Sequence, residues 1–169
     1  PMAKALAEAG CLVYIASTQK ENYEAAVKAL LASGLNACGV LLDMSDETSV
    51  LASLDTIKND GYIPDILINS ACNRPMKKFM EDSVENWDLS MSVNARGVFI
   101  TCRAFANAMA LRGSGSIINI SSIYGLVAPD MNIYEGSDFE TEPDYPFIKG
   151  GVIMLSKYFA SYYSKKGVR

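Results

Sequence analysis

The sequence SIINISS at residues 116–122 is a short apolar run that closes on two serines. A continuous apolar run of this length, bounded by turn residues, is typical of a strand buried on both faces of a parallel sheet. The glycine-rich stretch 113–115 forms the expected turn into it. Ligands of parallel α/β sheets bind outside the carboxyl ends of the strands. We therefore expect Ser122 to lie at a ligand-binding edge.

Three further apolar runs lie upstream, and helical stretches separate them. The predicted strands cover residues 11–16, 38–42 and 65–71, and the predicted helices cover residues 2–8, 21–32, 47–59, 84–112 and 145–164. Strict alternation predicts parallel strands joined by right-handed crossovers. The predicted fold class is α/β, a three-layer, doubly wound parallel sheet of the Rossmann type. We expect residues 1–169 to form a single domain, with an irregular segment at 123–144.

The two ends of the sequence depart from this pattern. A doubly wound domain normally begins with a strand and a glycine-rich turn, whereas residues 1–10 (PMAKALAEAG) predict a helix. At the other end, residues 167–169 stand where another strand is expected. We therefore expect the sheet to be incomplete at both termini of this sequence.

Composition narrows the function classes. Half of the 169 residues are apolar and the net charge is −4, which suits a globular domain. Neither a basic stripe for nucleic acid nor an apolar run of about 18 residues for a membrane span is visible. The first residues lack the core of a secretory signal, so we expect a cytoplasmic protein. Because histidine is absent, histidine triads are excluded and no metal site is expected. We interpret the four cysteines as buried, reduced thiols.

Tyr145 and Lys149 form a Y-x-x-x-K pair in the last predicted helix. Positions i and i+4 share one helix face, and an ammonium near a phenol lowers the tyrosine pKa. Such a tyrosine can give or take a proton near neutral pH. The pair alone is weak, since a surface pair is the ordinary structural interpretation, and its meaning depends on the rest of the sequence.

Polar residues at strand ends and within one helix supply that context. A Ser122 hydroxyl can stabilise negative charge that develops on a carbonyl oxygen, although a plain strand-ending serine is the structural alternative. The N-S-A stretch at 69–71 ends another predicted strand and should border the same crevice. Asn94 lies in mid-helix, where asparagine is unfavourable unless its amide has a partner. A local hydrogen bond is the alternative there.

Four motifs then follow one another on matching elements. They are N-S-A-C at 69–72, N-A-R-G at 94–97, I-N-I-S-S at 118–122 and Y-P-F-I-K at 145–149. This ordered set resembles the short-chain dehydrogenase/reductase family over nearly the whole chain, 2–169. The resemblance implies an NAD(P)-binding Rossmann-like domain and reversible hydride transfer between nicotinamide C4 and a carbonyl carbon. The stretch from I-Y-G-x-V-A-P-D to Y-E-G is also similar to a bacterial subgroup associated with flagellin modification and sugar pathways.

The resemblance assigns catalytic roles to matching residues. It makes Tyr145 the general acid/base and Lys149 the residue that lowers the tyrosine pKa and holds the nicotinamide ribose. It makes Ser122 the residue that orients and polarises the substrate oxygen. Asn94 holds a water that continues a proton relay through Lys149. The family also commonly assembles through the helices that contain Asn94 and Lys149, which implies a homodimer or homotetramer.

The resemblance also assigns cofactor-binding positions. Those on the adenine and adenosine side are Asp43, Met44, Asn69, Ser70 and Ala71. Sites for NAD usually carry an acid after the strand at 11–16, to bind the ribose 2′-hydroxyl. Here that strand is followed by Ser17, Thr18, Gln19 and Lys20. Both NAD and NADP remain open, and we favour NADP because Ser17, Thr18 and Lys20 can hold a 2′-phosphate.

Two internal departures from the family pattern affect the prediction. Cys72 stands where the family usually has a glycine that lets the chain pass close to the cofactor. Ser122 and Tyr145 are 23 residues apart (145 minus 122), further than in short members of the family. The added segment, 128–144, holds six acidic residues and no basic one. It is either a solvated acidic loop or a lid over a substrate that is hydroxyl-rich or amine-bearing.

We therefore predict an NAD(P)-dependent oxidoreductase for a small polar substrate that resembles a sugar or polyol. Two alternatives stay open. One is a sugar-nucleotide dehydratase or epimerase, which uses the same tyrosine and lysine but retains its cofactor. The other is a non-catalytic binding protein derived from the fold, which the absence of a glycine-rich phosphate turn favours.

Overall fold

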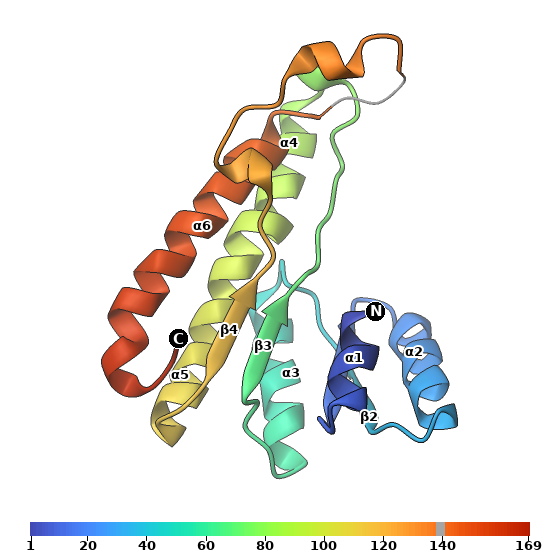
Figure 1. Cartoon of the computed structure of the whole chain (residues 1–169), viewed down its shortest axis with the longest axis vertical. Helices are drawn as coiled ribbons and strands as arrows, with labels where there is room; N and C mark the ends of the chain where they lie inside the picture. The colour runs from blue at the N-terminus through green and yellow to red at the C-terminus, as the bar shows by residue number, and fades with distance from the viewer. Residues whose placement is uncertain (138–140) are drawn as a thin grey trace. The chain divides into compact units, whose positions relative to one another are not determined.

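The computed structural model describes residues 1–137 and 141–169 (Figure 1). The chain forms two compact units, Pro1–Gly61 and Tyr62–Arg169. Each unit is described by itself below.

The first unit contains three helices and two strands. They are α1 (Met2–Glu8), β1 (Val13–Ser17), α2 (Lys20–Ala32), β2 (Ala37–Leu41) and α3 (Glu47–Asn59). Strands β1 and β2 pair in parallel, with Val13 opposite Ala37 and Ser17 opposite Leu41. A parallel pair needs a crossover connection, and α2 supplies it.

Capping and close packing explain the local structure of this unit. The Asp46 carboxylate accepts a hydrogen bond from the Thr48 N–H at 2.9 Å and caps α3. Helix α2 lies so close to β2 that a Cβ placed on Gly39 would come within 2.2 Å of the Tyr23 ring. Only glycine therefore fits at this point of the strand.

The second unit holds the longer helices. Its strands are β3 (Ile66–Asn69) and β4 (Ser116–Asn119), which pair in parallel with Ile66 opposite Ser116. The helices are η1 (Phe79–Glu81), α4 (Val84–Met91), η2 (Ser92–Gly97), α5 (Val98–Arg112), η3 (Ile123–Gly125), η4 (Met131–Tyr134), α6 (Asp144–Tyr163) and η5 (Ser164–Lys166). Figure 1 shows α6 running alongside α4 and α5, with which it is in contact.

A polar network lies inside this unit, between the strands and the long helices. The Asn69 amide donates to the Asn119 oxygen at 2.8 Å and to the Cys102 sulfur at 3.3 Å. Asn119 in turn donates to the Ser156 hydroxyl at 2.9 Å. Burial raises the pKa of the Cys102 thiol to about 11, because the charged thiolate is poorly solvated there. The network joins β3, β4, α5 and α6.

The predicted α/β class with parallel strands is confirmed, and the differences lie in element lengths. The strands are shorter than predicted, since β3 ends at Asn69 and β4 at Asn119. The predicted helix at 84–112 is interrupted by π-helical turns at Ser92–Gly97, which contain Asn94. Val168 forms a parallel bridge with Gly115, so strand-like pairing does occur near residues 167–169. The single-domain assignment stays a prediction.

None of the helices in the described part of the chain is both long enough and apolar enough to cross a bilayer.

The environments of the cysteines predict unequal reactivity. Cys72 is exposed, whereas Cys102 is fully buried with a pKa of about 11. The thiolate is the reacting species, and both the burial of Cys102 and its raised pKa keep the Cys102 thiolate scarce at pH 8. We expect iodoacetamide to label Cys72 in the folded protein and Cys102 only after unfolding, as read by peptide mass spectrometry. Equal labelling of both residues in the folded protein would contradict this packing.

Candidate active site

Tyr145 and Lys149 lie in the first turns of α6, one turn apart. The Lys149 side chain is buried, and its Nζ donates to the backbone oxygen of Ile120 at 2.7 Å. The same Nζ lies 5.6 Å from the centroid of the Tyr145 ring. The helix therefore brings the ammonium next to the phenol ring, and a backbone carbonyl from the end of β4 holds it there.

Ser122 lies in the segment that supplies this carbonyl. Its Oγ accepts a hydrogen bond from the Tyr124 N–H at 3.2 Å and thereby caps η3. The preceding Ser121 hydroxyl donates to the backbone oxygen of Lys149 at 2.8 Å. A Cβ on Gly125 would come within 2.7 Å of the Lys149 carbonyl. The end of β4, η3 and α6 are thus in backbone contact, and this contact places Ser122 beside the Lys149 turn.

Asn94 points out of the π-helical turns toward the segment that follows β3. Its Oδ1 accepts from the Asn73 N–H at 2.8 Å, and its Nδ2 donates to the Asn73 carbonyl. Nδ2 also contacts the Ser90 hydroxyl at 3.1 Å. The amide is buried and has the partners that a mid-helix asparagine needs. The water relay assigned to Asn94 by resemblance stays a prediction.

Sequence reasoning missed Ser90 and Asp144. The Ser90 hydroxyl donates to the Asp144 carboxylate, and both side chains are buried. Ser90 also accepts from Asn94, so a buried polar chain runs from the π-helical turns to the first residue of α6. A carboxylate at a helix N-terminus is favourable, and this was the signal available for Asp144. Ser90 precedes Asn94 by one helical turn.

Arg74 and Glu142 were also missed. The Arg74 guanidinium lies over the Tyr145 ring, 4.7 Å from its centroid. One of its nitrogens is 2.6 Å from the Glu142 carboxylate. The arginine side chain is 32% exposed and the glutamate 11%. A basic residue two positions after the N-S-A-C motif was the available sequence signal.

In the described parts of the acidic segment, 128–137 and 141–144, several side chains make specific contacts within the protein. Asp130 caps η4, and the Tyr134 hydroxyl bonds to the hydroxyls of Tyr124 at 2.9 Å and Thr141 at 2.7 Å. The bond to Tyr134 raises the pKa of Tyr124. Glu142 and Asp144 are buried, whereas Asp138 and Glu140 lie outside the described residues. A role as lid stays a prediction.

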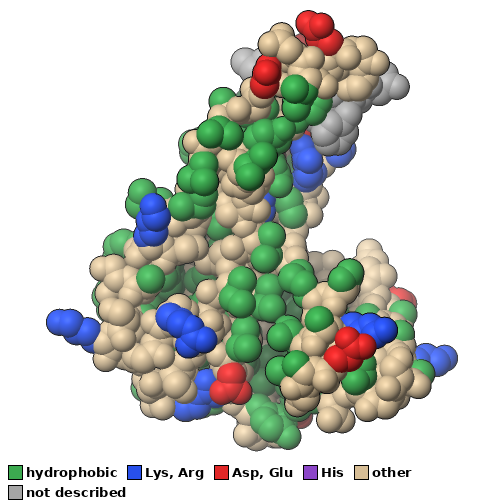
Figure 2. Space-filling model, in the orientation of Figure 1, with side chains coloured by type: hydrophobic (Ala, Val, Ile, Leu, Met, Phe, Trp, Pro, Cys, Tyr) green, Lys and Arg blue, Asp and Glu red, His purple; other side chains and the backbone are tan. Residues whose placement is uncertain are grey.

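Apolar side chains dominate the exposed surface of η3, η4 and the residues between them. In Figure 2, hydrophobic side chains gather over this part of the second unit. The exposed ones are Ile123, Leu126, Val127, Met131 and Ile133. The surface near Ser122 therefore offers apolar contacts besides the carboxylates.

The predicted cofactor positions fall in both units. In the first unit, Ser17 is the last residue of β1 and Thr18 follows it. The Asp43 carboxylate beyond β2 accepts from the Ser45 N–H at 2.8 Å. Met44 is buried. These polar groups lie at the carboxyl ends of parallel strands, where dinucleotides bind in this fold. Hydroxyls of this kind fit a phosphate or a ribose.

In the second unit, the residues after β3 are exposed and small. Ser70, Ala71 and Cys72 are all exposed, whereas the Asn69 side chain is buried in the network with Cys102 and Asn119. An open, small-residue backbone suits the adenosine side of a dinucleotide. The Lys149 ammonium and the Tyr145 hydroxyl are groups that suit its nicotinamide ribose. The Asn69 side-chain amide instead bonds to side chains in the interior of the unit.

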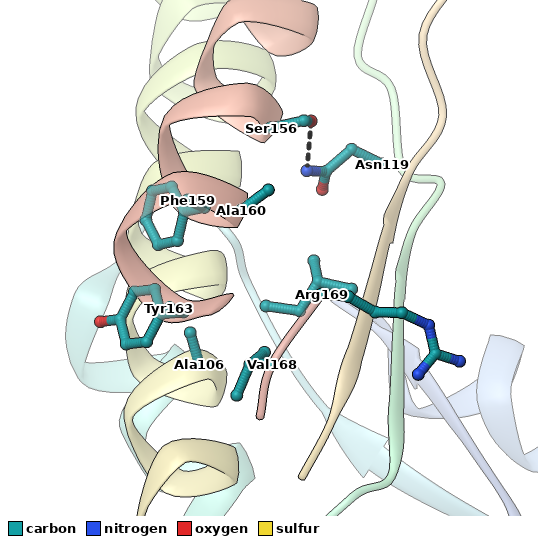
Figure 3. A pocket seen from close by; sticks show the side chains of 9 residues that line it. Ala106, Asn119, Ser156, Phe159, Ala160, Tyr163, Val168 and Arg169 are labelled. Atoms are coloured by element: carbon teal, nitrogen blue, oxygen red, sulfur yellow. Dashed lines mark hydrogen bonds between the residues drawn. The ribbon is translucent and has the colours of Figure 1, made fainter. Parts of the chain in front are cut away.

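A small cavity lies apart from these residues. It lies between α5, α6 and β4, has a volume of about 30 Å³, and is lined in part by Asn119, Ser156 and Tyr163 (Figure 3). Such a volume holds about one water molecule. None of the four predicted catalytic residues lines it, so we interpret it as a packing void.

Comparison with known proteins places these features in a family. The family model described as short chain dehydrogenase matches residues 1–169. The chain is 35% identical over 133 residues to a cyclopentanol dehydrogenase of Comamonas sp., covering 78% of this chain and 53% of that protein. It is 31% identical over 169 residues to the gluconate 5-dehydrogenase of Gluconobacter oxydans, covering 99% and 62%.

The structure is similar to a solved relative as well. It superimposes with a TM-score of 0.87 and 28% identity on a gluconate 5-dehydrogenase from Burkholderia cenocepacia crystallised with NADP and tartrate. The match covers 99% of this chain and 62% of that one. The chain thus spans less than two thirds of the length of each of these relatives.

The contact between Gly125 and α6 predicts a sharp difference between two glycines. Gly125→Ala places a Cβ against the Lys149 backbone, and overpacking of this kind costs about 1–3 kcal/mol. A Cβ at Gly151, which lies in α6 two residues after Lys149, meets nothing within 4 Å. Gly151→Ala should therefore stabilise the folded protein by about 0.5–1 kcal/mol. Urea unfolding measures both. A Gly125→Ala protein as stable as the Gly151→Ala protein would refute the close approach.

Ser90 should contribute strongly to stability for its size. Ser90→Ala leaves the buried Asp144 carboxylate without the hydroxyl that donates to it, at a cost of about 1–3 kcal/mol. Ser92→Ala removes a hydroxyl that bonds only the Leu89 carbonyl near the surface, and should change stability by less than about 0.5 kcal/mol. Equal urea midpoints for the two variants would rule out the buried chain.

Proposed function

Because the chain belongs to the short-chain dehydrogenase family, we propose that it carries the catalytic part of an NAD(P)-dependent oxidoreductase that interconverts a carbonyl and an alcohol. One observation carries this proposal. The buried Lys149 ammonium is held by the Ile120 carbonyl 5.6 Å from the Tyr145 ring. A cation beside the ring is placed to offset the negative charge that a phenol oxygen carries whenever it has given up its proton to a substrate.

In the proposed reaction Tyr145 handles the proton. It donates its hydroxyl proton to the substrate oxygen when a carbonyl is reduced, and accepts the proton back when an alcohol is oxidised. Bound NAD(P) supplies or accepts the hydride at nicotinamide C4. Ser122, at the end of β4, orients the substrate oxygen and stabilises the charge that develops on it. Lys149 holds the ribose, and Asn94 continues the proton path.

For the cofactor we propose NADP over NAD. No acid follows β1, and Ser17, Thr18 and Lys20 are suited to a 2′-phosphate. The relative from Burkholderia cenocepacia was crystallised with NADP, which supports the choice. Asp43 and Met44, together with Ser70 and Ala71, are the proposed adenine and adenosine contacts. We also propose that both compact units belong to one nucleotide-binding domain, because one family model spans them.

The proposed substrate is a small polar molecule of the sugar-acid or polyol kind. Relatives named gluconate 5-dehydrogenase support this class. The apolar surface of η3 and η4 admits a substrate with an apolar portion, and the relative named cyclopentanol dehydrogenase acts on such a molecule. Flagellin-modification and sugar pathways remain the proposed setting for the subgroup.

For assembly we propose a homodimer or homotetramer through the helices that contain Asn94 and Lys149. Large apolar side chains on α5 and α6 remain exposed within the second unit. They are Phe99, Leu111, Phe147, Met154, Tyr158 and Tyr162. The proposed compartment is the cytoplasm, since all four cysteines are free thiols.

The direct test is removal of the Tyr145 hydroxyl. We expect Tyr145→Phe to lower kcat for oxidation of gluconate or cyclopentanol with NADP by about 10²–10⁴-fold, because proton transfer is lost. NADPH binding, followed by nicotinamide fluorescence, should be retained. Tyr62→Phe, at an exposed tyrosine outside the four motifs, is the matched control and should leave kcat unchanged.

Two results would overturn the proposal. Full activity of Tyr145→Phe would exclude the mechanism, and failure of the parent protein to bind NADPH or NADH at millimolar concentration would favour the non-catalytic alternative. Net consumption of added cofactor separates the dehydrogenase from a dehydratase or epimerase, which returns its cofactor unchanged.

A further inference from the structure

Arg74 and Tyr145 come from separate segments of the second unit, and the Arg74 guanidinium lies over the Tyr145 ring. The Arg74 Cζ lies 4.7 Å from the centroid of the Tyr145 ring, and one guanidinium nitrogen lies 2.6 Å from the Glu142 carboxylate. The backbone oxygen of Glu142 accepts the N–H of Tyr145 at 3.2 Å. Arg74 therefore contacts the tyrosine ring and also the residue that bonds the tyrosine backbone.

The other side of Arg74 is fixed through its neighbour. Both backbone polar groups of Asn73 pair with the side-chain amide of Asn94. An amide that accepts from the N–H of one residue and donates to the C=O of the same residue fixes the backbone of that residue on both sides. Arg74 thus stands between Asn94, which holds the backbone of the preceding residue, and Glu142, which holds its guanidinium.

The guanidinium suits this place for two reasons. It is planar and stacks on aromatic faces, and it stays charged at every pH at which the protein is folded. It is also a second cation on the ring, in addition to the Lys149 ammonium at 5.6 Å. A cation near a phenol favours the phenolate. Glu142 offsets part of the charge, but the guanidinium carbon is close to the ring itself.

We propose that Arg74 is a positioning residue for Tyr145. Anchored by Glu142 and carried by the Asn73–Asn94 pair, it holds the phenol ring in place and puts a second cation beside it. This rests on the proposed function, in which Tyr145 exchanges a proton with the substrate. Arg74 acts through Tyr145, since its hydrogen-bond and ring contacts are to Glu142 and Tyr145.

The test is the pH dependence of kcat/KM for alcohol oxidation with NADP, using gluconate or cyclopentanol. This rate rises with pH as the general base loses its proton. We expect Arg74→Met to move the rising limb to higher pH, so that kcat/KM below the limb falls by about tenfold for a displacement of one pH unit. Arg74→Lys keeps a cation and should restore the limb most of the way, with kcat still reduced because the planar stack is lost.

Arg103→Met is the matched control. The Arg103 guanidinium lies 5.0 Å from the Phe99 ring centroid, so the substitution removes a contact of the same kind on α5. Its pH profile should coincide with that of the parent protein. Circular dichroism and NADPH fluorescence titration establish that each variant is folded and binds cofactor.

An Arg74→Met protein that loses kcat but keeps the position of its pH profile would overturn the proposal, because a merely structural role has that signature. If Arg74→Met does not fold, Glu142→Gln takes its place. Loss of the Glu142 carboxylate removes both a negative charge and the ion pair that fixes the Arg74 guanidinium. The rising limb of the pH profile of Glu142→Gln must therefore move, and an unmoved limb overturns the proposal. If the parent protein shows no cofactor-dependent turnover, the proposed function itself fails, which is a different result.

Discussion

The buried ammonium of Lys149 is the constraint on which the second unit depends. Burying a charge is costly unless it is hydrogen-bonded, and the Ile120 carbonyl at 2.7 Å meets that need. This carbonyl is available only because the chain leaves β4 beside the first turns of α6. The Ser121 bond to the Lys149 backbone and the close approach of Gly125 hold the two segments together. The position of Tyr145, one turn before Lys149, follows from the need to hydrogen-bond the buried Lys149 ammonium.

The second unit also buries several polar side chains, and these need hydrogen-bond partners in its interior. The Asn69, Cys102, Asn119 and Ser156 side chains bond to one another between β3, β4, α5 and α6. Within the described residues, every buried side-chain nitrogen and oxygen has a partner. A fully bonded network of this kind specifies how the strands and helices register against each other. It also accounts for Asn69, whose side chain serves the interior although its segment continues into the exposed residues 70–72.

Local pattern explains why part of this arrangement could be predicted from the sequence. Apolar runs and caps located the strands and helices, and the spacing of Tyr145 and Lys149 put both on one helix face, as observed. The π-helical turns around Asn94 escaped prediction because the residues 92–97 fit an ordinary helix equally well. The Ser90–Asp144 and Arg74–Glu142 contacts join residues more than 50 positions apart. Apolar periodicity carries no information about such pairs, so only the fold reveals them.

The two acids that flank Pro143 are buried, although they belong to an acidic segment of the sequence. By composition they belong to an acidic, solvated segment, yet Glu142 is turned toward Arg74 and Asp144 toward Ser90. Each anchors the start of α6 to a different segment of the chain, one after β3 and one in α4. Residues 128–137 bond to their neighbours through the Tyr134 hydroxyl and carry exposed apolar side chains instead. Because the contacts of Glu142 and Asp144 lie outside that stretch, its surface can change while the start of α6 stays in place.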